Sequence, residues 1–277
     1  MVAAALVAAP ALIGLGYAAA GALDLIGPGA RGGDGLRLLR VLGEPAVWRG
    51  VLWSGWVAAA ATASATVAAI GVATLFPPGG PRSRLARALA VLPLPVPHVV
   101  AAFTAVLVLS QSGVLARIGH ALGVVDAPAA MPALVYDAWG VGVIAALAWK
   151  EFPFLALLAF TLAAARGTGA EEAARTHGAN RWTTWRRITL PLLWRGLVPG
   201  VVAVFIFAFG SYETAALLAP TAPRALPLLV EERYTAADLA SRGDAYVLTL
   251  VALLVASLAV AVHEMARART ERESGEG

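Results

Sequence analysis

The sequence predicts an all-α integral membrane protein that forms a single membrane domain over residues 1–277. Of its residues, 59% are hydrophobic and only 14% are charged, and the mean hydropathy is +0.75. A soluble domain of this length has too little interior to bury so much apolar surface, so lipid is the expected solvent. Six long apolar stretches follow one another, and one charged, helix-forming segment lies between the fourth and the fifth.

Each apolar stretch is long enough to cross a bilayer, which takes about 20 residues for roughly 30 Å of hydrocarbon. The six stretches cover residues 2–26, 51–76, 89–112, 139–162, 197–218 and 245–265. The first has no basic residue ahead of its apolar run, so we expect a membrane span there rather than a signal peptide.

Six spans place both ends of the chain on the same side of the membrane. With the ends in the cytoplasm, twelve arginines lie in inside loops and eight in outside loops. The positive-inside rule therefore favours cytoplasmic ends, although Arg37, Arg40 and Arg49 oppose it. Residues 266–277 are expected to form a solvated, irregular cytoplasmic tail.

The residue types exclude several kinds of chemistry. There is no cysteine, so disulfides and thiolate nucleophiles are excluded, and the four histidines lack metal-ligand spacing. Lys150 is the only lysine and follows Trp149, so the Gly-Lys pair of a phosphate-binding P-loop is missing. We expect a protein without catalytic residues, metal or bound cofactor, and no nucleic-acid partner.

The charged segment, residues 164–196, forms the largest cytoplasmic loop in this topology. Thr168 and Glu171 have the spacing of a capping box at the start of a short helix. Gly178 is suited to the left-handed position that ends this helix. Asn180 is placed to cap a second short helix, 181–187, and Pro191 marks the entry to the fifth span.

A helix of about eight residues is marginal by itself in water, so the first helix needs something to pack against. Ala173, Ala174 and His177 offer a small-residue face that fits a groove on a partner protein. The alternative is a helix lying among lipid headgroups, with Trp182 and Trp185 inserted into the bilayer. These residues by themselves leave both possibilities open.

The same segment resembles the EAA motif of the permease subunits of binding-protein-dependent ABC importers. The matching positions are Glu172, Ala173, Ala174, Gly178, Ile188, Leu190 and Pro191. The resemblance is best over residues 139–200 and extends over a permease core at 50–265.

The resemblance implies a multi-pass protein of the bacterial inner membrane, with the motif as a coupling helix. Glu172, Ala173 and Ala174 would dock on a separate ATPase that carries the ATP and Mg, and Gly178 would make the turn. A second permease subunit and an extracytoplasmic substrate-binding protein are the other implied partners.

Charged and polar residues within the spans are candidates for the translocation path. Lys150 and Glu151 lie near the middle of the fourth span, where charges usually face protein or water; a link to another span is the structural alternative. In the fifth span, Ser211, Tyr212 and Glu213 interrupt the apolar run, unless the span simply ends near Phe209.

Two further expectations concern His98 and the substrate. His98 follows a proline-rich stretch and is expected to satisfy a backbone carbonyl that the prolines leave free, the alternative being a contact with the substrate. The stretches "FAFGSYETAALLAP" and "RALPLLVEERY" resemble permeases of polyamine, ferric-iron, thiamine and phosphonate importers. The competing class is a secondary transporter driven by an ion gradient, using Lys150, Glu151 and Glu213.

Overall fold

The structure, a computed structural model, describes residues 2–27, 36–167 and 169–275. Within these ranges the regular secondary structure is entirely helical, as the composition predicts. The α-helices are α1 (Val2–Ala22), α2 (Arg37–Leu42), α3 (Pro45–Leu75), α4 (Pro81–Val91), α5 (His98–Leu109), α6 (Val114–Ala121), α7 (Val141–Arg166), α8 (Gly169–Thr176), α9 (Arg181–Thr184), α10 (Leu190–Phe209), α11 (Tyr212–Leu218), α12 (Leu226–Thr235) and α13 (Ser241–Gly275). A 3₁₀ turn (Pro128–Ala130) and a π turn (Trp185–Thr189) complete the set.

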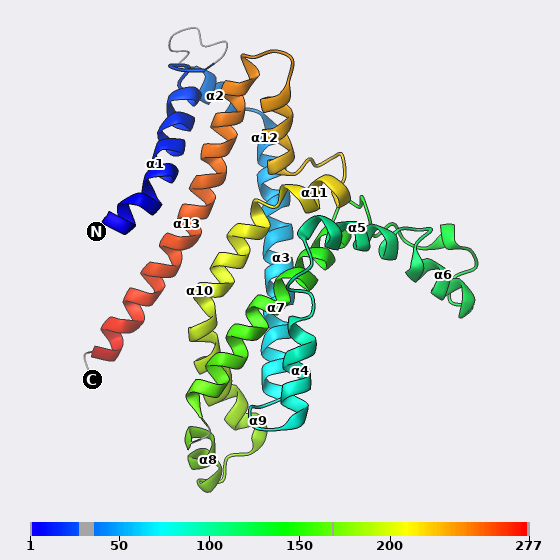
Figure 1. Cartoon of the computed structure of the whole chain (residues 1–277), viewed down its shortest axis with the longest axis vertical. Helices are drawn as coiled ribbons and strands as arrows, with labels where there is room; N and C mark the ends of the chain where they lie inside the picture. Colours follow the sequence, from blue (N-terminus) through cyan, green and yellow to red (C-terminus); the bar gives the residue numbers. More distant parts are fainter. Residues whose placement is uncertain (1, 28–35, 168, 276–277) are drawn as a thin grey trace.

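Helices α3, α7 and α10 pack together as the centre of the fold (Figure 1). The buried face of α3 carries a stripe of alanines at helical spacing, including Ala58, Ala61, Ala65 and Ala69. Small side chains let helix backbones approach closely, which matters in lipid because packing contacts hold membrane helices together. On α10, a Cβ at Gly200 would lie 2.7 Å from a methyl carbon of Leu158, so a larger residue there would require the Leu158 side chain on α7 to move.

Helices α1 and α13 lie side by side at the margin of this bundle (Figure 1). They run in opposite directions, so both termini point toward the end of the molecule that carries α8. This arrangement agrees with the expectation that the two ends and the 164–196 loop share one side of the membrane.

Five helical segments of the described chain are long and apolar enough to cross a membrane. They are Pro45–Leu75, His98–Ala121, Val141–Arg166, Arg181–Phe209 and Ser241–Ala268, and a shorter apolar helix covers Leu12–Ala22. The expected set of about six apolar segments is therefore present, but several of the expected boundaries change.

The third expected span, 89–112, is broken in two. α4 ends at Val91, a turn containing Pro93, Pro95 and Pro97 follows, and α5 begins at His98. Proline lacks a backbone N–H and pushes the preceding residue out of the helical region, so three alternating prolines stop the helix. The apolar segment begins instead at His98 and continues into α6.

The fifth expected span, 197–218, ends early, and the last helix runs further than expected. α10 stops at Phe209, Gly210 and Ser211 form a break, and α11 starts at Tyr212. The expected irregular tail is also wrong within the described residues, because α13 continues as a helix through Gly275.

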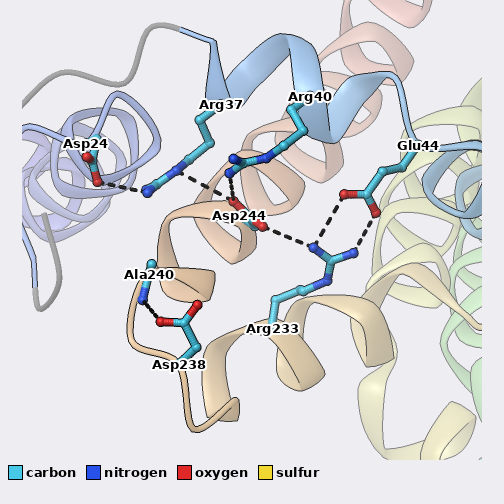
Figure 2. A network of polar contacts seen from close by, with 8 residues as sticks. All are labelled: Asp24, Arg37, Arg40, Glu44, Arg233, Asp238, Ala240 and Asp244. Carbon is cyan, nitrogen blue, oxygen red and sulfur yellow. Dashed lines mark hydrogen bonds and ion pairs between the residues drawn. The ribbon is translucent and has the colours of Figure 1, made fainter. Parts of the chain in front are cut away.

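The end of the molecule opposite α8 carries a network of charged side chains from five parts of the chain (Figure 2). Three acids and three arginines contribute: Asp24, Glu44, Asp244, Arg37, Arg40 and Arg233. The charges of these six side chains balance, which limits the cost of removing them from water.

Asp244 is the centre of this network and is only 7% exposed. Its carboxylate lies 3.0 Å from Arg233 Nη1, 3.3 Å from Arg40 Nη2 and 3.6 Å from Arg37 Nε. Arg37 also pairs with the buried Asp24 at 2.9 Å. Arg37 and Arg40, which oppose the positive-inside rule, are therefore ion-paired with acids. Because the rule gives acids little weight, this pairing does not change the count of arginines on each side.

Candidate functional site

Helix α8 and the turn after it have the local geometry that the sequence predicts. Gly178 adopts φ +83°, in the left-handed region. The N–H of Ala179 donates to the Ala174 carbonyl at 3.0 Å and the N–H of Gly178 donates to the Arg175 carbonyl at 2.9 Å. These two bonds are the Schellman pattern that ends a helix. A Cβ at Gly178 would touch nothing within 4 Å, so glycine is favoured there by its backbone conformation and not by lack of space.

The second short helix begins where the sequence predicts. The Asn180 side-chain oxygen accepts the N–H of Thr183 at 2.8 Å, which caps α9. The expectation of a separate helix over 181–187 is wrong, because α9 passes through the π turn directly into α10. Pro191 lies at the first turn of α10 and offers no N–H to the preceding turn, which favours a wider π turn there.

Glu171 joins α8 to the membrane helices. Its Oε1 atom accepts from Arg166 Nη2 at 2.8 Å and from the Thr189 hydroxyl at 2.5 Å. Arg166 ends α7 and Thr189 ends the π turn before α10, so one carboxylate holds three segments together. Thr168 lies outside the described residues, so the capping box stays a prediction. Sequence reasoning missed this role of Glu171, because it depends on a residue 18 positions away.

The motif residues divide between an exposed helix and the start of a membrane helix. Helix α8 has no buried residue: Glu172 and Ala173 are exposed, and Ala174 is half-buried. Ile188 and Leu190 are half-buried in the π turn and α10. The result is a short helix that protrudes from the bundle (Figure 1) while its base is fixed by an ion pair.

Lys150 and Glu151 each contact a different part of the proline-rich break. Lys150 is buried, and its ammonium donates to the Leu94 carbonyl at 3.1 Å. Glu151 lies 3.0 Å from His98 Nε2, and the His98 ring packs 4.8 Å from the ring of Phe207. The expectation for His98 is therefore wrong, because the lysine and not the histidine satisfies a free carbonyl.

Ser211, Tyr212 and Glu213 do not lie within a continuous span. The Ser211 hydroxyl donates to the Thr214 hydroxyl at 3.1 Å at the start of α11, and Tyr212 and Glu213 are exposed. Tyr212 lines a cavity of about 470 Å³ between α10, α12 and α13, together with Glu231. These residues belong to the break after α10, which lies toward the same end of the molecule as the charged network.

Comparison with known proteins identifies the family. Residues 45–271 match the family described as "Binding-protein-dependent transport system inner membrane component". The molybdenum transport system permease protein ModB of Mycobacterium tuberculosis is 28% identical over 234 residues, which are 82% of each chain. The sulfate transport system permease protein CysW of Synechococcus elongatus is 35% identical over 96 residues, which are 34% of each chain.

A solved structure has the same fold. It is a crystal structure of a bacterial alginate ABC transporter in complex with an alginate pentasaccharide-bound periplasmic protein. The match has a TM-score of 0.70 at 18% sequence identity, and covers 94% of this chain and 88% of that chain. The chain therefore belongs to the inner membrane components of binding-protein-dependent transport systems, the permease subunits of ABC importers, and is a multi-pass transport protein rather than an enzyme.

Proposed function

We propose that α8 and the turn after it couple this permease to a separate cytoplasmic ATPase, which binds the ATP and Mg. The observation that carries the proposal is that α8 has no buried residue, yet its base is tied to α7 and to the turn before α10 through Glu171. A displaced α8 would move both membrane helices with it. Glu172, Ala173 and Ala174 form the docking face, and Ile188, Leu190 and Pro191 carry the motion into α10.

The proposed substrate is a tetrahedral oxyanion of the molybdate or sulfate type. The support is the molybdenum permease, which matches over 82% of both chains, and the partial match to a sulfate permease. This replaces the polyamine, ferric-iron, thiamine and phosphonate group expected from the sequence, which these relatives do not support. The substrate would arrive from an extracytoplasmic binding protein and cross between this chain and a second permease subunit.

The residues proposed for the path are those at the two breaks in the spans. Tyr212 and Glu213 would lie at the extracytoplasmic mouth with Ser211 behind them. Glu151 and Lys150 would flank the path deeper in the membrane, at the contact between α7 and the proline-rich turn. The ion-gradient alternative is set aside, because the family to which the chain belongs consists of ABC importer subunits.

The test of coupling compares two substitutions at Gly178. Gly178→Val places a β-branched residue at φ +83°, which costs about 1–3 kcal/mol in the left-handed region. Gly178→Asn is the matched control, because asparagine tolerates that region. Nothing within 4 Å obstructs either side chain.

We expect Gly178→Val to lose uptake while its level in the membrane stays unchanged, and Gly178→Asn to keep most uptake. Glu172→Arg should reduce the amount of ATPase that co-purifies with the tagged chain. Normal uptake by Gly178→Val, or equal loss in both Gly178 variants, would contradict the coupling role.

A further inference from the structure

A cavity of about 480 Å³ lies between α8–α9 and the membrane helices. The end of α3, the Pro77–Pro78 turn, the end of α7 and the π turn before α10 form its other walls. It is therefore bounded by both the proposed coupling segment and the bundle that this segment would move. We call it the arginine cavity, after the three arginines that line it: Arg166, Arg175 and Arg181.

The lining of the arginine cavity carries an excess of positive charge. Glu171 is the one acid among its lining residues, against three arginines. Its Oε1 atom already accepts two hydrogen bonds, from Arg166 and Thr189. Neither Arg175 nor Arg181 has an ion-pair partner in the described part of the chain. Two positive charges are thus left without compensation next to a hollow that has room for a small anion.

The guanidinium of Arg166 also has N–H donors that lack an acceptor among the described residues. A guanidinium carries five N–H donors, and only the Nη2 atom of Arg166 has a described partner, Glu171. Its Nε and Nη1 atoms are buried and lack a hydrogen-bond partner among the described residues. Buried donors without acceptors destabilise a fold, so these two N–H groups favour an acceptor placed in the arginine cavity.

We propose that the arginine cavity binds a tetrahedral oxyanion, held by the guanidinium groups of Arg166, Arg175 and Arg181. Phosphate-type groups suit this lining because they accept several charge-assisted hydrogen bonds from arginine. The ligand's source is either a free inorganic anion or the phosphate of a lipid headgroup, which present the same chemistry. Bound there, it joins α7 to α8 and α9 and fixes the orientation of the coupling segment.

The test uses the purified full-length chain in a non-ionic detergent, with radiolabelled sulfate and phosphate as probes in equilibrium dialysis. The test variant is Arg175→Gln/Arg181→Gln, which removes two cavity arginines whose side chains are exposed enough to leave the fold intact. The matched control is Arg186→Gln/Arg187→Gln, which removes the same charge from exposed arginines outside the cavity. Native mass spectrometry of each variant records any retained phospholipid.

Saturable anion binding that weakens about tenfold or more in the test variant, but not in the control, would identify a free anion as the ligand. A phospholipid that is retained by the wild type and the control but lost from the test variant would identify the headgroup phosphate. Equal loss in both variants would show general charge attraction and overturn the proposal. Absence of any bound oxyanion in the wild type would overturn it as well.

Discussion

The charged network in Figure 2 lets us predict how much stability the protein loses when Asp244 is replaced. Asp244→Ala removes the carboxylate that forms ion pairs with Arg37, Arg40 and Arg233, at 3.6, 3.3 and 3.0 Å. The remaining five charges would then carry a net charge of +1 around a position that is only 7% exposed. Breaking a buried ion pair from one side costs about 3–5 kcal/mol.

Two features reduce that cost here. In the variant, Arg37 still forms its ion pair with Asp24, and Arg233 still forms its ion pair with Glu44. The Arg40 side chain is 59% exposed, and an exposed pair contributes at most about 1 kcal/mol. We therefore expect Asp244→Ala to lower the free energy of unfolding by about 2–3 kcal/mol.

The assay is reversible unfolding in mixed detergent micelles, titrated with SDS and followed by tryptophan fluorescence. Arg40→Gln is the matched control, since it changes an arginine whose side chain is 59% exposed and should lower the free energy of unfolding by less than about 1 kcal/mol. If Asp244→Ala destabilises the protein no more than Arg40→Gln does, the network does not hold this end of the bundle together.

Three further predictions follow from other contacts. Gly243→Ala should lower the free energy of unfolding by about 2 kcal/mol in the same assay, because the Arg37 guanidinium occupies the place of the added Cβ. An unchanged midpoint of SDS unfolding would refute this packing. Combining His98→Ala with Glu151→Ala should lower the free energy of unfolding by less than the sum of the two single substitutions, with a coupling energy of about 1–3 kcal/mol in a double-mutant cycle. Additive effects would mean that the contact between these two side chains contributes nothing to stability. Burial lowers the pKa of Arg233, but the hydrogen bonds and charges of Glu44 and Asp244 together raise it above the ordinary arginine value. Because the folded-state pKa is raised, the charged Arg233 contributes its full stability below the ordinary arginine pKa, and this contribution is lost only as the pH rises through the folded-state pKa. Arg233→Gln should therefore lower the free energy of unfolding equally at pH values from neutral to mildly alkaline. A loss of stability that vanished within that range would contradict the raised pKa.

The features that the sequence predicts correctly are local ones. The apolar composition requires a membrane and therefore helices, because lipid offers no partner for an open backbone. Gly178 ends α8 and Asn180 starts α9, because each needs only the backbone within five residues of it. The motif that contains them is likewise set by spacing along the chain, and it pointed to the family that the comparisons confirm.

Other features required the folded chain. The sequence showed that Lys150, Glu151 and His98 are polar, but not which partner each would meet across more than fifty residues. The prolines at 93, 95 and 97 were visible, but the packing of α5 against α7 after this break was not.

The two charged regions depend most clearly on the tertiary structure. Arg40 meets Asp244 across 204 positions, and Arg233 meets Glu44 across 189. The arginine cavity likewise exists only because α3, α7 and α8–α9 converge. Hydrophobicity, capping and turn formation act over a few residues and can be read along the chain, whereas ion pairs and cavities are set by distances in space that sequence separation does not encode.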